Sequence, residues 1–213
     1  MCENNKIKKF LKKLSSGRSM VEMIGVMAIV GCLSIAGLAG YVKASHILRT
    51  NKLKDDISHL IANIRTVFYA QNDYKAISVV AAINAGVVPE YMIGADKVSM
   101  INRFNGSIYI GPAATELDEN GAFILVFNGL DGETCRSIVS EDWGSDMQTG
   151  FLGMTVKKDG ELTVETSKML NKEFQTDETT FNARDLRKSM TALAYTPCDC
   201  GTMNLCAIAW KFL

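Results

Sequence analysis

The chain has 213 residues, which is enough for one globular domain and one membrane segment. Its formal net charge is zero, because 23 basic side chains balance 23 acidic ones. The charge is spread unevenly, since residues 1–17 carry five lysines and one glutamate. The rest of the chain is therefore acidic by about four charges, so a nucleic-acid partner has no electrostatic support.

A basic stretch comes before the longest apolar run. The run from Met20 to Val42 contains one charged residue, Glu22, and is long enough for a bilayer-spanning helix, which needs about 20 residues. Positive residues stay on the cytoplasmic side, so the C-terminal bulk of the chain is predicted to be exported. A carboxylate in a membrane helix costs about 3 kcal/mol, which predicts a functional role for Glu22. The basic stretch contains Lys6, Lys8, Lys9, Lys12 and Lys13.

The junction between these two segments carries a motif. Residues 15–22 read SSGRSMVE, and the block from Gly17 to Tyr41 resembles the type IV pilin superfamily, which includes type IV pilins and the pseudopilins of type II secretion. The resemblance implies that a prepilin peptidase cuts after Gly17 and that Arg18 becomes the methylated N-terminus. It also implies that Glu22 is the acid used in assembly. Arg18 is a departure, because the family usually has an apolar or aromatic residue there.

The same resemblance implies a division of the chain. Residues 1–17 would be a leader peptide, 18–42 a transmembrane and filament-core helix, and 43–213 an exported head. The expected partners are the prepilin peptidase, copies of this chain and other pilins, and the inner membrane before assembly. The expected locations are the inner membrane with a periplasmic head, and then an extracellular pilus or a periplasmic pseudopilus. Bundling of many such helices would use the small residues Gly25, Gly31, Gly37 and Gly40.

Two alternatives to a pilin remain open. A pseudopilin, a part of a secretion machine, shares the same N-terminal motif. The segment from Ile29 to Cys32 also approximates a lipoprotein processing box, which would make the chain a lipid-anchored or bitopic exported protein that forms no polymer. Apolar sequence continues for about ten residues beyond Cys32, where a lipoprotein usually has a polar tether.

The helix is predicted to continue past the membrane segment, from about Ser19 to Tyr69. Apolar residues recur at three- and four-residue steps, a pattern typical of an amphipathic helix. Such a helix is about 75 Å long and must bury its apolar face, most simply against a sheet formed by the rest of the chain. The neighbouring pair Asp55 and Asp56 is expected on the solvated surface. The stripe consists of Ile57, Leu60, Ile61, Ile64, Val67 and Phe68.

The remaining sequence predicts short helices and strands, and hence an α+β head with an antiparallel sheet. Lys157 to Gly160 is expected to be a hairpin turn, because Asp-Gly favours positive φ. Helices are predicted at Lys75–Ala85, Asp131–Glu141 and Asn182–Leu193. Strands are predicted at Ser107–Gly111, Ala122–Asn128, Gly150–Val156, Glu161–Glu165 and Ala207–Phe212.

Four cysteines lie in the exported part, where disulfides persist: Cys135, Cys198, Cys200 and Cys206. A bond between Cys198 and Cys200 would close a strained ring, so Cys135 is expected to join Cys198 or Cys200, and the other to join Cys206. Closing a loop of over 60 residues is worth about 4 kcal/mol in the chain-entropy model. The spacing does not suit a structural zinc site.

The chain contains no recognisable catalytic constellation. A nucleophile, a base and an orienting group cannot be assembled from its residues, and phosphate-binding glycine motifs are absent from the sequence. The sequence therefore predicts a structural subunit without a metal or cofactor, and not an enzyme.

Overall fold

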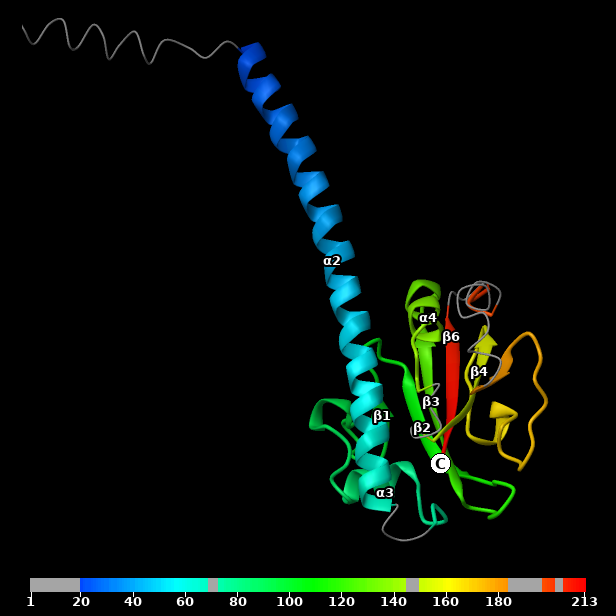
Figure 1. Ribbon diagram of the computed structural model, residues 1–213. Coiled ribbons are helices and arrows are strands. Elements are labelled where there is room, and N and C mark those ends of the chain that lie inside the picture. The colour runs from blue at the N-terminus through cyan, green and yellow to red at the C-terminus, as the bar shows by residue number, and fades with distance from the viewer. Residues whose placement is uncertain (1–19, 69–72, 145–149, 184–196, 202–204) are drawn as a thin grey trace, which may run out of the picture. The chain divides into compact units, whose positions relative to one another are not determined.

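The computed structural model describes residues 20–68, 73–144, 150–183, 197–201 and 205–213 (Figure 1). These residues belong to two compact units, which divide after Leu48. The N-terminal unit is the first part of helix α2 (Met20–Phe68), and the C-terminal unit holds the rest of α2 and all other elements. The expectation of one long N-terminal helix is confirmed, although Ser19 and Tyr69 lie outside the described residues.

Helix α2 changes character along its length. Its apolar residues up to position 48 are exposed, and its first buried residue is Thr50. From there the buried side chains recur at three- and four-residue steps, as an amphipathic helix requires. They are Thr50, Leu53, Asp56, Ile57, Leu60, Ile61, Ile64 and Phe68.

The C-terminal unit is built on a six-stranded antiparallel sheet with the order β1-β2-β3-β6-β4-β5. The chain therefore inserts its last strand, β6, between β3 and β4 at the centre of the sheet. The strands are β1 (Met100–Ile101), β2 (Ser107–Ala113), β3 (Ala122–Leu130), β4 (Phe151–Lys158), β5 (Thr180–Asn182) and β6 (Cys206–Phe212).

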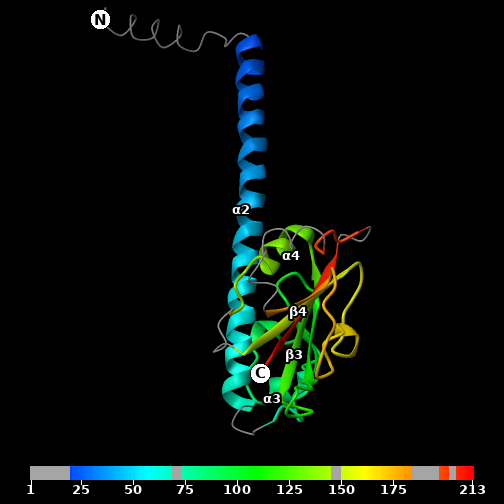
Figure 2. The ribbon, with the colours of Figure 1, turned by 45° about the vertical axis from the view of Figure 1, so that its right-hand side comes forward.

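The two faces of the sheet are both covered. Within the C-terminal unit, the part of α2 from Arg49 runs along one face, which we call the inner face (Figure 2). There Leu53, Ile57 and Leu60 join a core with large side chains of the central strands, including Phe127 and Trp210. On the opposite, outer face, a smaller cluster is covered by the segment between β4 and β5, which we call the strap (residues 159–179).

The short helices connect these layers. They are α3 (Val79–Asn84), α4 (Gly132–Val139) and the 3₁₀ turns Glu90–Met92 and Glu165–Ser167. The predicted helix Lys75–Ala85 is shorter than expected, because Ser78 is extended and caps α3 with its side chain on Ala81 N. The predicted helix Asp131–Glu141 is present as α4, with Asp131 as its cap.

One predicted strand is wrong. Asp159 and Gly160 have the positive φ angles expected of a turn, 46° and 105°, yet the following residues do not return along β4. Leu162 is instead held by the side chain of Asn128, which accepts from Leu162 N at 2.7 Å and donates to Leu162 O at 3.0 Å. Both backbone groups of Leu162 are thus satisfied by a side chain of β3.

The edge of β4 is occupied by β5, whose last residue, Asn182, was predicted to begin a helix. Phe181 pairs with Met154 and Asn182 pairs with Gly153 in this ladder. Residue Asn182 is therefore extended, which corrects the predicted helix start at that position. Residues 184–193 of the predicted helix lie outside the described residues.

Candidate functional site

The first turn of α2 carries Glu22, which the sequence predicts to act in assembly. Glu22 lies in the first turn, and its neighbours along the helix are exposed apolar side chains. Gly17 and Arg18 lie outside the described residues. A helix that is apolar on all sides needs lipid or other helices around it. Within the described residues, α2 is the one helix that is long and apolar enough to cross a membrane.

The glycines of this part of α2 are unexplained by the chain's own packing. A Cβ atom added to Gly25, Gly31, Gly37 or Gly40 would meet no atom within 4 Å outside the local helix. Each glycine nevertheless costs about 1 kcal/mol of helix stability relative to alanine. Packing among the described residues therefore gives no reason for these glycines.

A second feature, not anticipated from sequence, anchors α2 to the loop before β2. Asp56, of which 4% is exposed, accepts from Arg103 Nε and from Arg103 Nη2, the latter at 3.0 Å. It also accepts a hydrogen bond from the Tyr91 hydroxyl. The guanidinium of Arg103 stacks over the Tyr91 ring, 4.6 Å from its centroid. We call these three residues the clamp.

The contacts in the clamp shift the pKa values of Arg103 and Tyr91. The hydrogen bond from Arg103 to Asp56 raises the pKa of the guanidinium. Burial raises the pKa of the Tyr91 phenol, and its hydrogen bond to Asp56 raises it further. At neutral pH Arg103 is therefore charged and Tyr91 keeps its proton, and the clamp acts as a structural contact between the helix and the loop.

The clamp corrects the interpretation of Asp55 and Asp56 as a solvated pair. Asp55 is exposed, but Asp56 is buried. Its position gives the signal that could have revealed this, because Leu53, Asp56, Ile57 and Leu60 follow the three- and four-residue steps of the buried stripe. A carboxylate on such a stripe requires a partner, which here is Arg103.

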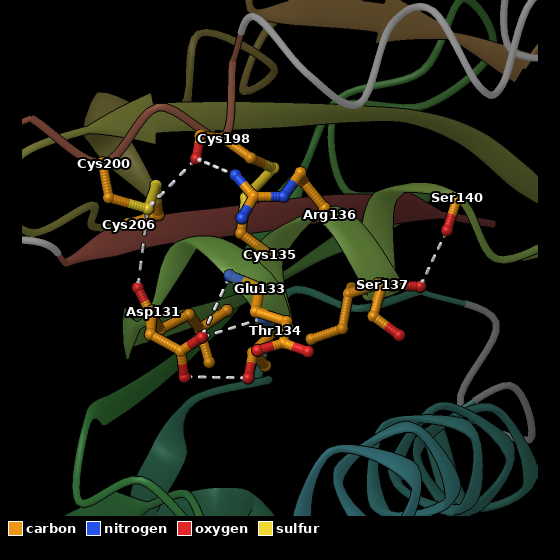
Figure 3. Close-up of a disulfide and its surroundings, with 12 residues drawn as sticks. Asp131, Glu133, Thr134, Cys135, Arg136, Ser137, Ser140, Cys198, Cys200 and Cys206 are labelled. Carbon is orange, nitrogen blue, oxygen red and sulfur yellow. Dashed lines mark hydrogen bonds between the residues drawn. A yellow bond between two sulfur atoms is a disulfide. The ribbon is translucent and has the colours of Figure 1, made fainter. Parts of the chain in front are cut away.

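One disulfide joins α4 to the C-terminal segment, and a second lies within that segment (Figure 3). Cys135 bonds Cys198 and Cys200 bonds Cys206, with Cα–Cα distances of 5.6 and 5.0 Å. This is one of the two pairings that the sequence left open. Arg136 Nη1 also donates to Cys198 O at 3.4 Å, so the first bridge is supported by a neighbouring polar contact.

Two polar contacts tie the same helix α4 and its C-terminal end to α2. The Thr50 and Thr134 hydroxyls lie 3.2 Å apart in a buried contact. The Lys54 ammonium lies 2.6 Å from a Glu141 carboxylate oxygen. The disulfides, α4 and the second half of α2 thus form one connected part of the head.

The described residues contain no cluster of three or more His, Cys, Asp or Glu side chains placed to hold a metal ion. The four cysteines of the head are bonded in pairs and so offer no thiolate ligand. The features that stand out are therefore an apolar helix with an acid in its first turn and a cross-linked head.

Comparison with known proteins decides the family. The PilS N-terminal family model matches residues 48–184. The chain belongs to the PilS N-terminal family, within the type IV pilin superfamily. A curated relative, the major structural subunit of the bundle-forming pilus of Escherichia coli O111:H-, is 21% identical over 154 residues, which are 71% of this chain and 77% of that protein.

A solved pilin structure has the same fold. TcpA, a type IV pilin from Vibrio cholerae El Tor biotype, matches with a TM-score of 0.54 at 16% identity, covering 78% of this chain and 99% of that chain. A type IVb pilin from Salmonella typhi covers 75% of this chain and 97% of that chain, with 13% identity and a TM-score of 0.45. The pilin-like α+β fold predicted from the sequence is confirmed. The relatives are structural subunits, in agreement with the prediction that this pilin is not an enzyme.

Proposed function

We propose that this pilin polymerises through the apolar part of α2 into a type IV pilus-like filament. The strongest support for this proposal is the exposure of that segment in the single chain. Its apolar side chains are exposed, and its four glycines contact nothing beyond the local helix. Packing of many such helices would bury the apolar surface and use the close approach that glycine permits.

Before assembly, the same surface would be covered by lipid. The basic residues 1–17 keep the leader in the cytoplasm, so the head enters the periplasm and α2 anchors the precursor in the inner membrane. A prepilin peptidase then removes the leader after Gly17. In this proposal residues 18–42 are the filament-core helix and residues 43–213 the exported head.

Glu22 would set the register between subunits. A carboxylate in an apolar filament core needs a counter-charge, because an isolated buried ion is heavily penalised. The new amino group of Arg18 on a neighbouring subunit supplies one. A buried ion pair of this kind selects one axial position of the helices, which is the best-attested use of such pairs.

Replacing the acid tests this assignment. In a Glu22→Ala variant we expect leader removal to continue and surface filaments to be lost, as measured by immunoblotting and by electron microscopy of sheared cell-surface material. Asp55→Ala is the matched control, because Asp55 is an exposed acid on the same helix and outside the apolar segment. Normal filaments in Glu22→Ala, or equal loss in both variants, would refute the role given to Glu22.

The same cells separate a pilin from a pseudopilin. Antibody against the head should label filaments on intact cells if the subunit forms a pilus. Label that appears only after the outer membrane is permeabilised would instead place the polymer in the periplasm and favour the pseudopilin alternative.

A further inference from the structure

One segment of the strap, residues 170–174, is held to the sheet by few contacts (Figure 1). Leu170 O accepts a hydrogen bond from Ala114 N at 2.9 Å, and Asn171 O accepts one from Lys211 Nζ at 2.7 Å. These are the hydrogen bonds that the segment forms within the described part of the chain. We call this segment the latch.

Open space lies on two sides of the latch. Leu170 and Asn171 line a cavity of about 700 Å³, and Phe174 lines a second cavity of about 540 Å³. Lys172 and Glu173 line both cavities. Protein interiors are held in place by close packing, which the latch lacks on these two sides. A segment with few hydrogen bonds and little packing opens locally at a lower free-energy cost than the surrounding core.

The residues that flank the latch are held more firmly. Met169 is fully buried in the cluster on the outer face of the sheet. Asp177 accepts hydrogen bonds from Thr179 N and Thr180 N at 2.7 and 2.8 Å. It also pairs with Lys168 at 3.0 Å, so the two ends of the loop that carries the latch are joined. The latch is therefore free to move while the rest of the strap stays on the sheet.

The latch covers a buried lysine. Lys211 is in the central strand β6, and none of its surface is exposed. An ammonium group has three donors, and Asn171 O is the one hydrogen-bond acceptor found for Lys211 among the described residues. None of the ion pairs formed there includes Lys211. Burial of the amine lowers the pKa of Lys211 to about 8.

An aromatic ring completes this cover. Lys211 pairs with Gly153 of β4, and a Cβ atom at position 153 would collide with the Phe174 ring. The glycine thus leaves room for the ring, whose centroid lies 5.5 Å from Lys211 Nζ. The closed latch thereby keeps water away from a charged amine, and this desolvation costs free energy that hydration would recover.

We propose that the latch opens in the folded head to hydrate the ammonium group of Lys211. Opening moves Asn171 O and the Phe174 ring away from the amine and joins the two cavities into one groove with the amine at its floor. A neutral amine gains much less from hydration, so protonation of Lys211 drives the opening. The device depends on contacts within the head alone, and it does not rest on the proposed polymerisation.

The proposal predicts how opening depends on pH. The pKa of Lys211 is about 8 in the closed latch and returns to the ordinary 10.5 when the amine is hydrated. The open state therefore binds more protons between these values, and the opening constant falls as the pH rises. The two pKa values give a fall of about tenfold between pH 7 and pH 9. The other ionisable groups that face this space are Glu116, Lys172, Glu173 and the terminal carboxylate of Leu213, and groups of these types ordinarily titrate outside that interval.

Amide hydrogen exchange of the full-length chain in detergent micelles, followed by NMR, tests the proposal. Ala114 N reports on the latch because its acceptor is Leu170 O, whereas Leu162 N, bound to Asn128 Oδ1, reports on the rest of the strap. At pH 7 we expect the opening constant at Ala114 to exceed that at Leu162 by about tenfold or more. The constant at Ala114 should then fall about tenfold by pH 9. Equal opening constants at the two amides, or a constant at Ala114 that does not change with pH, would overturn the proposal.

Two lysine variants identify the charge responsible. In Lys211→Met the opening constant at Ala114 should stay within about twofold between pH 7 and pH 9, because the titrating amine is gone. Lys172→Met is the matched control, since it removes an exposed lysine of the latch itself and should keep the tenfold fall. Thermal melting establishes that both variants are folded. A tenfold fall that persists in Lys211→Met, or that disappears equally in Lys172→Met, contradicts the assignment.

Discussion

At the scale of single residues, two buried charges in the head have opposite surroundings. Asp56 is enclosed by Arg103 and Tyr91, which satisfy its carboxylate. Lys211 has one backbone acceptor and an aromatic ring within the described residues. The first charge therefore stabilises the contact between α2 and the loop before β2, whereas the second carries an unrelieved desolvation cost.

Removing the negative charge of the clamp should destabilise the head. In Asp56→Asn, Arg103 keeps its charge but loses its anionic partner, and the expected loss is about 1–3 kcal/mol in the free energy of unfolding. Arg103 is partly exposed, which keeps the loss below that of a fully buried pair. Urea unfolding measures it, with Asp55→Asn as the control, expected within about 0.5 kcal/mol. Equal effects in the two variants would show that the clamp contributes nothing specific.

Removing Lys211 should produce a pH-dependent gain in stability. Its folded pKa of about 8 lies below the ordinary 10.5, so the unfolded chain binds more protons between these values. The cost of burying the charge is complete below pH 8 and disappears as the pH rises to 10.5. The Lys211→Met variant should therefore be more stable than the unmodified chain near neutral pH. The difference in the free energy of unfolding should shrink between pH 8 and pH 10.5. Urea unfolding across pH should show it, and a constant difference would contradict it.

At the scale of elements, the two disulfides close loops of very different length. The bond from Cys135 to Cys198 spans 63 residues of sequence, whereas the bond from Cys200 to Cys206 spans 6. The long bridge restrains far more of the unfolded chain and also joins α4 to the segment before the central strand β6. It should be the one that helps an exposed filament resist unfolding under load.

Paired cysteine variants test that inequality. In the chain-entropy model, losing the Cys135–Cys198 bridge costs about 4 kcal/mol, and losing Cys200–Cys206 costs about 2 kcal/mol. The free energy of unfolding of Cys135→Ala/Cys198→Ala should therefore fall further than that of Cys200→Ala/Cys206→Ala. Equal losses in the two variants would contradict the predicted difference between the bridges. If reductant left the stability of the unmodified chain unchanged, neither bridge would stabilise the head.

Local sequence patterns predicted the helices and strands that depend mainly on interactions between neighbouring residues. The apolar run and the amphipathic stripe predicted α2, and four short segments of the sequence were correctly predicted as the strands β2, β3, β4 and β6. The strand expected at 161–165 was wrong because a long-range contact prevails there: Asn128 on β3 satisfies both backbone groups of Leu162. No local pattern encodes a contact between residues 34 positions apart.

Only some residues of the candidate site could be predicted from the sequence. Glu22 is conspicuous in sequence because it interrupts an apolar run, and the cysteines are conspicuous because of their type. Tyr91 lies in the 3₁₀ turn Glu90–Met92 and Arg103 in the loop between β1 and β2. Only the fold brings them to Asp56, 35 and 47 residues away. The register that places Lys211 beside Gly153 and Asn182 likewise depends on the insertion of β6 between β3 and β4.

At the scale of the whole molecule, the chain combines two parts with different requirements. The head has its own core and its own cross-links, whereas residues 20–48 bury almost nothing within the chain. The second part is therefore complete only in lipid or among other helices. In our proposal, lipid covers this apolar surface in the membrane precursor, and other helices cover it in the filament.

The N-terminus of the polymerised chain tests this account most directly. Filaments sheared from cells are purified, and the terminal peptide of the subunit is determined by mass spectrometry. We expect a chain that begins at Arg18, because the new amino group must be free to pair with Glu22 of a neighbour. Filaments built from chains that keep residues 1–17, or chains that begin at a lipidated Cys32, would contradict it.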